Sequence, residues 1–436
     1  MKTKKEHASA TGTVLAVATL ALSASLLTGC SPARTPTASE RQFMLAGKPI
    51  HISSLSCAAD GNFSAAGSIR STLGIERGVA LYSRDHGATW REAMLEPPAT
   101  GVALTHLDIP GTGPGSTPLL AGYHFARLSP PGPWWRSADH GASWHAVAAP
   151  LESPPEDYWW TPLSISQLGD NPPVFAYITR DPASSKLNPR RLLMRSGDNG
   201  RSWRPHGLPT ALEWASLASD GSGHVILSGR TPMTLFGGGS YPLFWSGDAG
   251  LTWQRVVEAY SPMGFFHAGD GNVITYNTSE RKGGRTLVAY SLDHGRNFVM
   301  SNDPDLNSSG MIEAIASDRR GRIIAITDSN HILVSDDDGV SWRIANDLPL
   351  SAVNYPPPRL LLFDNGVAVA LMPGGLIMRS SDRGDSWHSV QSPLAEGNYG
   401  FTTHCSDGSG LIFASGYGMA IRSLDHGQTW QPVELR

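Results

Sequence analysis

The stretch SRDHGATW, residues 83–90, decides the fold of this chain because its pattern returns along the whole sequence. In each copy an aspartate stands two residues after a serine, and a glycine stands two residues after the aspartate. Seven of the eight copies end in tryptophan, the last of them as SLDHGQTW at residues 423–430. The aspartates of the eight copies are Asp85, Asp139, Asp198, Asp248, Asp293, Asp337, Asp382 and Asp425. One octet would be weak evidence, but eight of them indicate a repeated structural unit.

These aspartates are 43 to 59 residues apart. Repeats of this length, with short apolar stretches broken by turn residues, are typical of β-propellers, in which each repeat forms one four-stranded sheet. Asp-Gly pairs such as Asp60-Gly61 and Asp407-Gly408 precede several octets and predict hairpins between first and second strands. The sequence therefore predicts an all-β fold, a single propeller of eight four-stranded blades. Seven blades are the alternative if one degenerate repeat is absorbed elsewhere.

The octet itself has the composition of a hairpin turn. Its aspartate can accept hydrogen bonds from turn amides and from the nearby hydroxyl, and its glycine can take the positive φ that other residues resist. The closing tryptophan can then fill the space between neighbouring sheets. The fifth copy has Asn297 in place of the hydroxyl residue and Phe298 in place of tryptophan, so we expect a looser turn there. A catalytic or metal-binding role for the aspartates is implausible, because one chemistry would have to repeat eight times.

The octets resemble the Asp box, or BNR repeat, of a group of β-propellers, over the chain from about residue 50 to the C-terminus. The resemblance implies that each box lies at the turn between the third and fourth strands of its blade. The group contains glycosidases such as sialidases, photosystem II assembly factors that bind proteins, and sortilin-type ectodomains that bind peptides. This chain has more repeats than the six of sialidases, and it lacks their Arg-Ile-Pro motif. One propeller also cannot form the two-propeller cleft of the xyloglucan-cleaving relatives.

The N-terminus has the pattern of an export signal. Lys2, Lys4 and Lys5 precede an apolar stretch over residues 14–27, and the sequence Leu-Thr-Gly-Cys ends at Cys30. This ending resembles the bacterial lipoprotein signal, which implies lipid attachment at Cys30; an ordinary secretory signal is the alternative. We therefore expect a signal peptide over 1–29, a lipidated N-terminus and flexible tether over 30–42, and the propeller over 43–436.

The same N-terminal pattern predicts the location of the protein. An exported lipoprotein resides in the bacterial cell envelope, and serine rather than aspartate after the cysteine favours the outer membrane, on its periplasmic side or at the surface. Several acyl chains on one residue hold a protein firmly on a membrane. We therefore expect contact with the membrane through lipid only.

The composition excludes several other classes of partner. The formal net charge is −4, and no basic patch is visible, so nucleic acid is an unlikely partner. No zinc-type spacing of cysteine and histidine, phosphate-binding glycine loop or Gly-x-Ser-x-Gly motif is present. We expect no cofactor and no metal, and a monomeric protein.

Aromatic residues indicate a binding surface on the face opposite the boxes. The intervals between boxes lengthen around blades two to four, which predicts longer loops there. The candidate binding residues are Asp157, Tyr158, Trp159, Trp160, Trp214, Phe265, Phe266 and Tyr399. These aromatics would also be explained by packing between blades. The candidates for a glycosidase-type carboxylate pair are Glu156, Asp157, Glu213, Glu258 and Glu313.

These observations support two hypotheses about function. The first is a membrane-anchored exported propeller that binds a protein or glycan ligand, or assists protein assembly. The second is a glycan-acting enzyme, a glycoside hydrolase or lyase with a sialidase-like fold. No catalytic residue is assigned, and the pattern favours binding over catalysis.

The two cysteines that remain after Cys30 predict a disulfide. Cys57 and Cys405 each lie in the first strand of a repeat, the first and the last, just before an Asp-Gly turn. In a closed propeller these two strands are neighbours, and exported proteins meet an oxidising compartment. We therefore expect a bond between Cys57 and Cys405 that joins the first and last blades. Two unpaired buried thiols are the alternative.

Overall fold

The computed structural model shows an all-β chain. The residues that it describes are 44–45, 47–58, 60–71, 74–100, 103–108, 119–123, 134–147, 158–167, 174–182, 190–198, 202–212, 214–219, 222–232, 240, 242–256, 264–269, 271–277, 287–301, 303, 306, 309–348, 357–394, 400–416 and 419–433. Within these segments no helix is both long enough and apolar enough to cross a membrane. The expected signal peptide, Cys30 and the expected tether lie outside the described residues.

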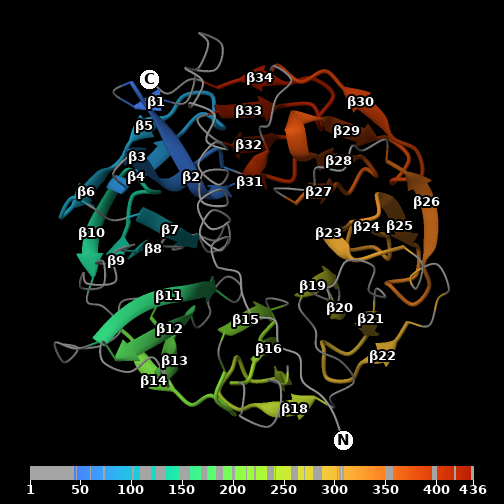
Figure 1. Cartoon of the computed structure of the whole chain (residues 1–436), viewed down its shortest axis with the longest axis horizontal. Helices are drawn as coiled ribbons and strands as arrows, with labels where there is room; N and C mark the ends of the chain where they lie inside the picture. The colour runs from blue at the N-terminus through green and yellow to red at the C-terminus, as the bar shows by residue number, and fades with distance from the viewer. Residues whose placement is uncertain are drawn as a thin grey trace, which may run out of the picture. The chain divides into compact units, whose positions relative to one another are not determined.

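The strands form eight separate sheets that follow one another along the chain, from blue to red in Figure 1. The first sheet contains β1 (Met44–Leu45), β2 (Lys48–Cys57), β3 (Phe63–Ser71), β4 (Gly74–Ser83) and β5 (Arg91–Glu92). The second contains β6 (Met94–Glu96), β7 (Ala103–Asp108), β8 (Leu119–Tyr123), β9 (Trp134–Arg136) and β10 (Ser143–Val147). The third contains β11 (Tyr158–Gln167), β12 (Val174–Pro182), β13 (Arg190–Ser196) and β14 (Arg204–His206). The fourth contains β15 (Trp214–Ser219), β16 (Val225–Arg230), β17 (Leu243–Ser246) and β18 (Gln254–Val256).

The other four sheets repeat the same plan. The fifth contains β19 (Gly264–Gly269), β20 (Asn272–Asn277), β21 (Leu287–Ser291) and β22 (Val299–Met300). The sixth contains β23 (Ile312–Ser317), β24 (Ile323–Thr327), β25 (His331–Ser335) and β26 (Arg343–Asp347). The seventh contains β27 (Arg359–Leu362), β28 (Ala368–Leu371), the short 3₁₀ turn η2 (Pro373–Gly375), β29 (Ile377–Ser380) and β30 (His388–Val390). The eighth contains β31 (Phe401–Ser406), β32 (Ile412–Gly416), β33 (Met419–Ser423) and β34 (Gln431–Pro432).

Two sheets differ from the expected four strands. In the first sheet β1 pairs antiparallel with the edge of β2 that faces away from β3, so that Met44 lies opposite Pro49 and Leu45 opposite Lys48. In the second sheet β6 pairs parallel with β10, although it follows β5 of the first sheet directly in sequence. The chain therefore passes directly from the last strand of the first sheet into an edge strand of the second.

The first strands of the sheets contact one another in sequence order. The contacts run through β2, β7, β11, β15, β19, β23, β27 and β31, and β31 also contacts β2. The first and last sheets thus pack together although their strands are about as distant in sequence as the chain allows.

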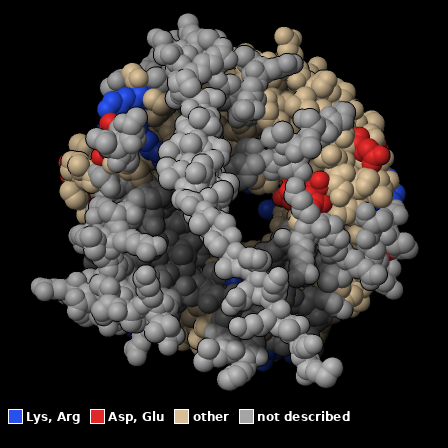
Figure 2. Space-filling model, in the orientation of Figure 1, with Lys and Arg blue, Asp and Glu red and all other residues tan. Residues whose placement is uncertain are grey.

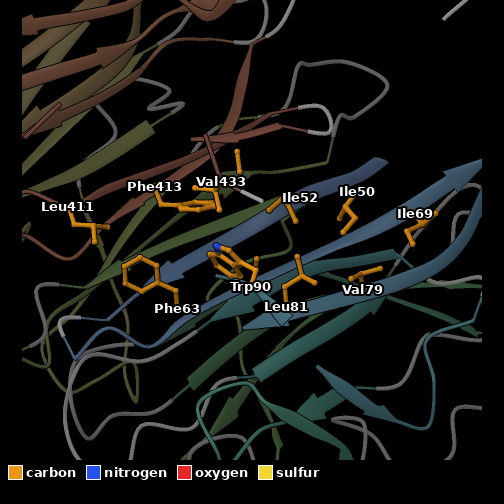
Figure 3. Close-up of a cluster of buried hydrophobic side chains, with 12 residues drawn as sticks. Ile50, Ile52, Phe63, Ile69, Val79, Leu81, Trp90, Leu411, Phe413 and Val433 are labelled. Atoms are coloured by element: carbon orange, nitrogen blue, oxygen red, sulfur yellow. The ribbon is translucent and has the colours of Figure 1, made fainter. Parts of the chain in front are cut away.

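A buried cluster at this junction joins the two ends of the body. It combines Ile52, Phe63 and Trp90 of the first sheet with Leu411 and Phe413 of the eighth, as Figure 3 shows. The Trp90 side chain is fully buried, and its ring centroid lies 5.0 Å from that of Phe413. Burial of aromatic and branched side chains of this size is the main stabilising contribution to a junction of this kind.

Each Asp box forms the turn between the third and fourth strands of its sheet. In the first box the Asp85 carboxylate accepts hydrogen bonds from the Ser83 hydroxyl (2.7 Å), the Thr89 amide (2.8 Å) and the Thr89 hydroxyl (2.6 Å). The Gly87 amide donates to the Ser83 hydroxyl, and the Trp90 indole N–H donates to the Gly87 carbonyl. The side chains of the box therefore fix the turn, and the His86 amide adds a bond to the Gly61 carbonyl of the first turn.

The expectation of a looser fifth turn is wrong for the hydrogen bonds to the Asp293 carboxylate. Asn297 replaces the hydroxyl residue fully, because its amide group donates to Asp293 Oδ2 at 2.6 Å and its backbone N–H donates to Oδ1 at 2.9 Å. The Phe298 side chain has no N–H group, so the bond from the closing side chain to the carbonyl of the box glycine is lost.

The boxes also join neighbouring sheets. In the seven boxes whose fourth residue the structure describes, that residue has a positive φ, for example 61° at Arg383, and in five of them its carbonyl accepts a hydrogen bond from a side chain of the preceding sheet. These bonds are Ser64 to His140, Trp245 to His294, Asn272 to Asp338, Arg322 to Arg383 and Arg379 to His426. The box glycine packs against the same neighbour: a Cβ on Gly384 would lie 2.5 Å from Ile324 Cδ1 of the sixth sheet. The absence of a side chain there is what lets the two sheets approach.

The structure joins Cys57 to Cys405 in a disulfide, the pairing expected from the sequence. The two Cα atoms are 5.6 Å apart, across the contact between β2 and β31. The bond spans 348 residues of sequence and supplements the apolar cluster at the junction.

Acid should destabilise the protein through its box aspartates. Burial opposes the ionised form of Asp382, but hydrogen bonds from Ser386, Ser380 and the turn amides outweigh it and lower the pKa to about 2. A pKa lowered on folding contributes stability that is present above pH 4 and is lost as the pH falls toward 2. Asp382→Asn should lower the free energy of unfolding at pH 7 by about 1–3 kcal/mol, and by less at pH 3. Denaturant unfolding at both pH values measures this, with exposed Asp347→Asn as control. Equal losses at pH 7 and pH 3 would contradict the role of the charge.

Removal of the disulfide should destabilise the junction without abolishing the fold. Cys57→Ser combined with Cys405→Ser should cost about 2–5 kcal/mol, since the bond restricts the unfolded chain over a long loop. Thermal unfolding of the variant, and of the parent protein with and without dithiothreitol, measures the effect. If both thiols react with an alkylating reagent in unreduced, denatured protein, the bond does not form.

Candidate functional site

A cavity of about 770 Å³ lies among the first strands of five sheets, β2, β19, β23, β27 and β31. It is situated at the C-terminal ends of these strands, where the chain turns into the second strand of each sheet. The boxes lie at the same end, because amides of the box turns bond to carbonyls of these first turns, as from His426 to Gly410. The lining residues are Cys57, Phe266, His267, Ile315, Ala316, Ser317, Arg319, Leu360, Leu361, Leu362, Phe363, Asp364, Ser406, Asp407 and Gly408. A volume of this size is typical of ligand-binding sites.

The walls of the cavity combine apolar side chains with polar groups, and the apolar ones are firmly held. Leu361 and Leu362 are half-buried, and Phe363 is buried in the cluster that joins the seventh and eighth sheets. Phe266 contributes to the cavity and also packs against the core between the fifth and sixth sheets. Cys57 places the disulfide at the wall. A ligand here would meet a preformed surface.

Charged side chains line the same cavity. Arg319 is exposed, and Asp364 is exposed and lies 3.3 Å from Arg320. The side chain of Asp407 is almost buried and accepts hydrogen bonds from the Ser409 amide (2.9 Å) and hydroxyl (2.8 Å). The site therefore offers apolar and polar wall groups together with one cation and two carboxylates.

A second charged cluster, between the sixth and seventh sheets, is structural. Arg322 is 2% exposed and donates to Asp336 at 2.7 Å, to Asp385 at 2.6 Å and to the Arg383 carbonyl at 2.8 Å. Burial opposes ionisation of Asp385, but hydrogen bonds from Arg343 and Arg322 lower its pKa. Every charge in this cluster is compensated within the protein, so it holds two sheets together and leaves no group for a ligand.

Two partly buried basic side chains, Arg359 and His404, lie on β27 and β31. Burial, together with the nearby positive charge of Arg359, lowers the pKa of His404 to about 4, so this histidine is neutral at physiological pH. Arg359 donates to the Thr402 carbonyl at 3.0 Å, and burial lowers its own pKa. Across the described segments, no three His, Cys, Asp or Glu side chains form a cluster able to hold a metal ion.

Only some of the residues predicted to bind ligand can be placed relative to the cavity. Phe266 reaches the cavity, whereas Phe265 packs beside Trp245 and Phe298 in the core between the fourth and fifth sheets. Tyr158, Trp159 and Trp160 begin β11 and Trp214 begins β15, and the structure describes only their backbone. The remaining candidates lie outside the described residues, namely Asp157 and Tyr399, with the carboxylates Glu156, Glu213 and Glu258. Glu313 lies in β23 and does not line the cavity.

The sequence analysis missed Arg319, Asp364 and Asp407 as site residues. All three lie in turns between first and second strands, and the turn at Asp407 was interpreted only as a hairpin turn. The signal that could have found them is their position: a turn after the first strand of a propeller sheet lies at the end of the central channel.

Charged side chains on the face shown in Figure 2 are scattered. Basic groups lie beside acidic ones over the first sheet, where Lys48 pairs with Glu76 and Arg77 with Glu92, and acidic groups are visible over β23 to β26. The described part of this face therefore carries no broad basic area of the kind that binds nucleic acid.

Comparisons with known proteins found similarity to solved structures alone. No protein-family model matches the chain, and no curated protein matches it. Solved structures similar to it include YCF48 from Cyanidioschyzon merolae (14% identity, 78% of this chain and 97% of that chain, TM-score 0.46) and Sqt1 from Saccharomyces cerevisiae (11%, 89% and 97%, 0.48). Another is a Hadza microbial sialidase, Hz136 (15%, 76% and 64%, 0.43). All three are β-propellers, and at these identities the similarity extends no further than the fold.

Proposed function

We propose that this chain is an exported, lipid-anchored β-propeller of eight blades that binds a ligand in the cavity at the box end. The observation that carries the proposal is the cavity itself, about 770 Å³ in volume and lined by the first strands of five sheets. Its apolar side chains would pack against the ligand, and its polar and charged groups would orient it. The ligand is a protein segment or a glycan, and the chain acts as a monomer.

The order of contacts supports the eight-bladed arrangement. Each first strand contacts the next, and the eighth sheet packs on the first through Trp90, Phe413 and the disulfide. A propeller closed in this way holds its central site rigid, so that binding needs no large rearrangement. The disulfide also fits a protein that works outside the cytoplasm.

The export signal supports a location in the cell envelope. Lipid on Cys30 would hold the protein at the outer membrane, with residues 31–42 as a tether of small and polar residues. The propeller would then meet ligands near the membrane surface, on its periplasmic side or outside the cell.

The box aspartates do not suit the role of acid in a glycosidase. A glycosidase needs a carboxyl group that holds its proton near neutral pH. The pKa of the box aspartates is lowered instead, by hydrogen bonds within each turn that outweigh the opposing effect of burial. A glycan-acting enzyme remains the second candidate, because Asp364 and Asp407 place two carboxylates in one cavity.

A binding screen tests the proposed function. The full-length protein in detergent should bind members of a combined peptide and glycan array, and Asp364→Arg should weaken the best binder at least tenfold by changing the charge of the cavity. Asp347→Arg, exposed on β26 and outside the cavity, is the matched control. Binding unaffected by Asp364→Arg would place the site elsewhere. Release of sugar from the array by the parent protein, lost on Asp364→Asn or Asp407→Asn, would establish the enzymatic alternative.

A further inference from the structure

The strand β27 meets the cavity with its edge. Five consecutive residues, 360–364, line the cavity. Side chains of successive strand residues point to opposite faces of a sheet, so a strand that turned one face to the cavity would contribute only every second residue. An unbroken run of lining residues means that the backbone itself borders the cavity.

The hydrogen bonds of β27 show which of its backbone groups face inward. The Phe363 N–H donates to the Val367 carbonyl at 2.9 Å, which makes this antiparallel pair a hydrogen-bonded one. Hydrogen-bonded pairs alternate along an antiparallel ladder, so Leu361, opposite Val369, also bonds to β28. Leu360 and Leu362 therefore direct their N–H and C=O groups away from β28, toward the cavity.

No strand of the described part of the chain pairs with this inner edge of β27. The strand forms the inner edge of its sheet. Figure 1 shows it between β23 and β31, which it contacts without pairing. Leu360 and Leu362 thus offer one N–H donor and one C=O acceptor each. The groups of the two residues lie about 7 Å apart along the strand. An exposed strand edge of this kind is a template for another chain.

The first sheet already accepts an added strand in the same way. There β1 pairs with β2 on the edge that corresponds to the inner edge of β27, with Met44 opposite Pro49. The geometry of these sheets is therefore compatible with a further strand at the inner edge.

The charges of the cavity select the kind of segment. Among the described residues no carboxylate forms an ion pair with Arg319, which is exposed and lines the cavity. Asp364 already lies beside Arg320, and Asp407 accepts bonds from Ser409. Arg319 is therefore the charged lining group for which the described residues supply no ion-pair partner, and it is the group that a carboxylate of the ligand would approach.

We propose, on the basis of the binding function proposed above, that the ligand is an extended acidic peptide that adds to the free edge of β27 as a fifth strand. Its main chain would pair with Leu360 and Leu362, its apolar side chains would pack on the cavity wall, and its carboxylate would approach Arg319. Main-chain pairing supplies affinity in this mode of recognition, and alternate side chains supply specificity.

N-methylated peptides test the main-chain pairing directly. The probe is the tightest binder from a synthetic library of acetylated octapeptides, labelled with fluorescein and titrated with the full-length protein in detergent. Two isomers of it are then made, each N-methylated on one of the two alternating sets of amides. Only one set faces β27, so one isomer should bind at least tenfold more weakly than the other. The proposal is overturned if both isomers bind with the same affinity, or if neither isomer binds.

Charge reversal tests the second contact. Arg319→Glu should weaken the unmethylated peptide at least tenfold, and Arg91→Glu, exposed on the outer strand β5, should leave it unchanged. Thermal unfolding confirms that each variant is folded. If peptide binding ignores Arg319, or if the array described above yields only glycans that depend on Asp364, the peptide proposal fails while the binding function stands.

Discussion

The contact of each Asp box with the preceding sheet is the interaction on which the rest of this structure depends. A residue with positive φ exposes its carbonyl to a side-chain donor of the neighbour, and the following glycine lets the neighbour approach closely. Both features require the turn to keep one conformation. The buried serine and the aspartate fix that conformation by their own hydrogen bonds, as Ser380 and Asp382 do in the seventh box.

Because the docking surface is built into every turn, the sheets can pack in sequence order without a long connecting element. The junction between the eighth sheet and the first repeats the same contact, since a Cβ on Gly87 would lie 3.0 Å from Phe413. At the other junctions the chain runs from one sheet into the next. At this junction the disulfide supplies the covalent link between the two sheets. Firm packing at every junction leaves the inner strand edges as the surfaces available to a ligand in the cavity.

The regular spacing of a few residue types was sufficient to predict the class of fold, the resemblance to Asp-box propellers implied the place of the boxes, and the closure of a ring predicted the cysteine pair. It was not sufficient for the donors between sheets. The acceptor is always a backbone carbonyl, but the donor is Ser64 in one junction, Trp245 in another and Arg322 in a third, so no pattern of residue types repeats. The fifth box failed as a prediction for a related reason: an asparagine amide can stand where a hydroxyl was expected.

The candidate site was predicted on the wrong evidence even where a residue agreed. Phe266 was chosen for its aromatic ring, yet it reaches the cavity through its place in β19, and Phe265 beside it is packed in the core. Which strand edge borders a cavity depends on the packing of several sheets, and local sequence carries no signal for it. The aromatic loops of blades two to four stay a prediction.

A double-mutant cycle between Gly384 and Ile324 tests the docking role of the box most directly. Gly384→Ala places a Cβ against Ile324 of the sixth sheet and also strains a backbone with φ of 91°. The strain is the same whether or not Ile324 is present, so it cancels in the cycle. The account predicts that Gly384→Ala costs at least about 1 kcal/mol less in the Ile324→Ala background. Costs that add to within about 0.5 kcal/mol would show that the box does not dock on its neighbour, and would contradict the account.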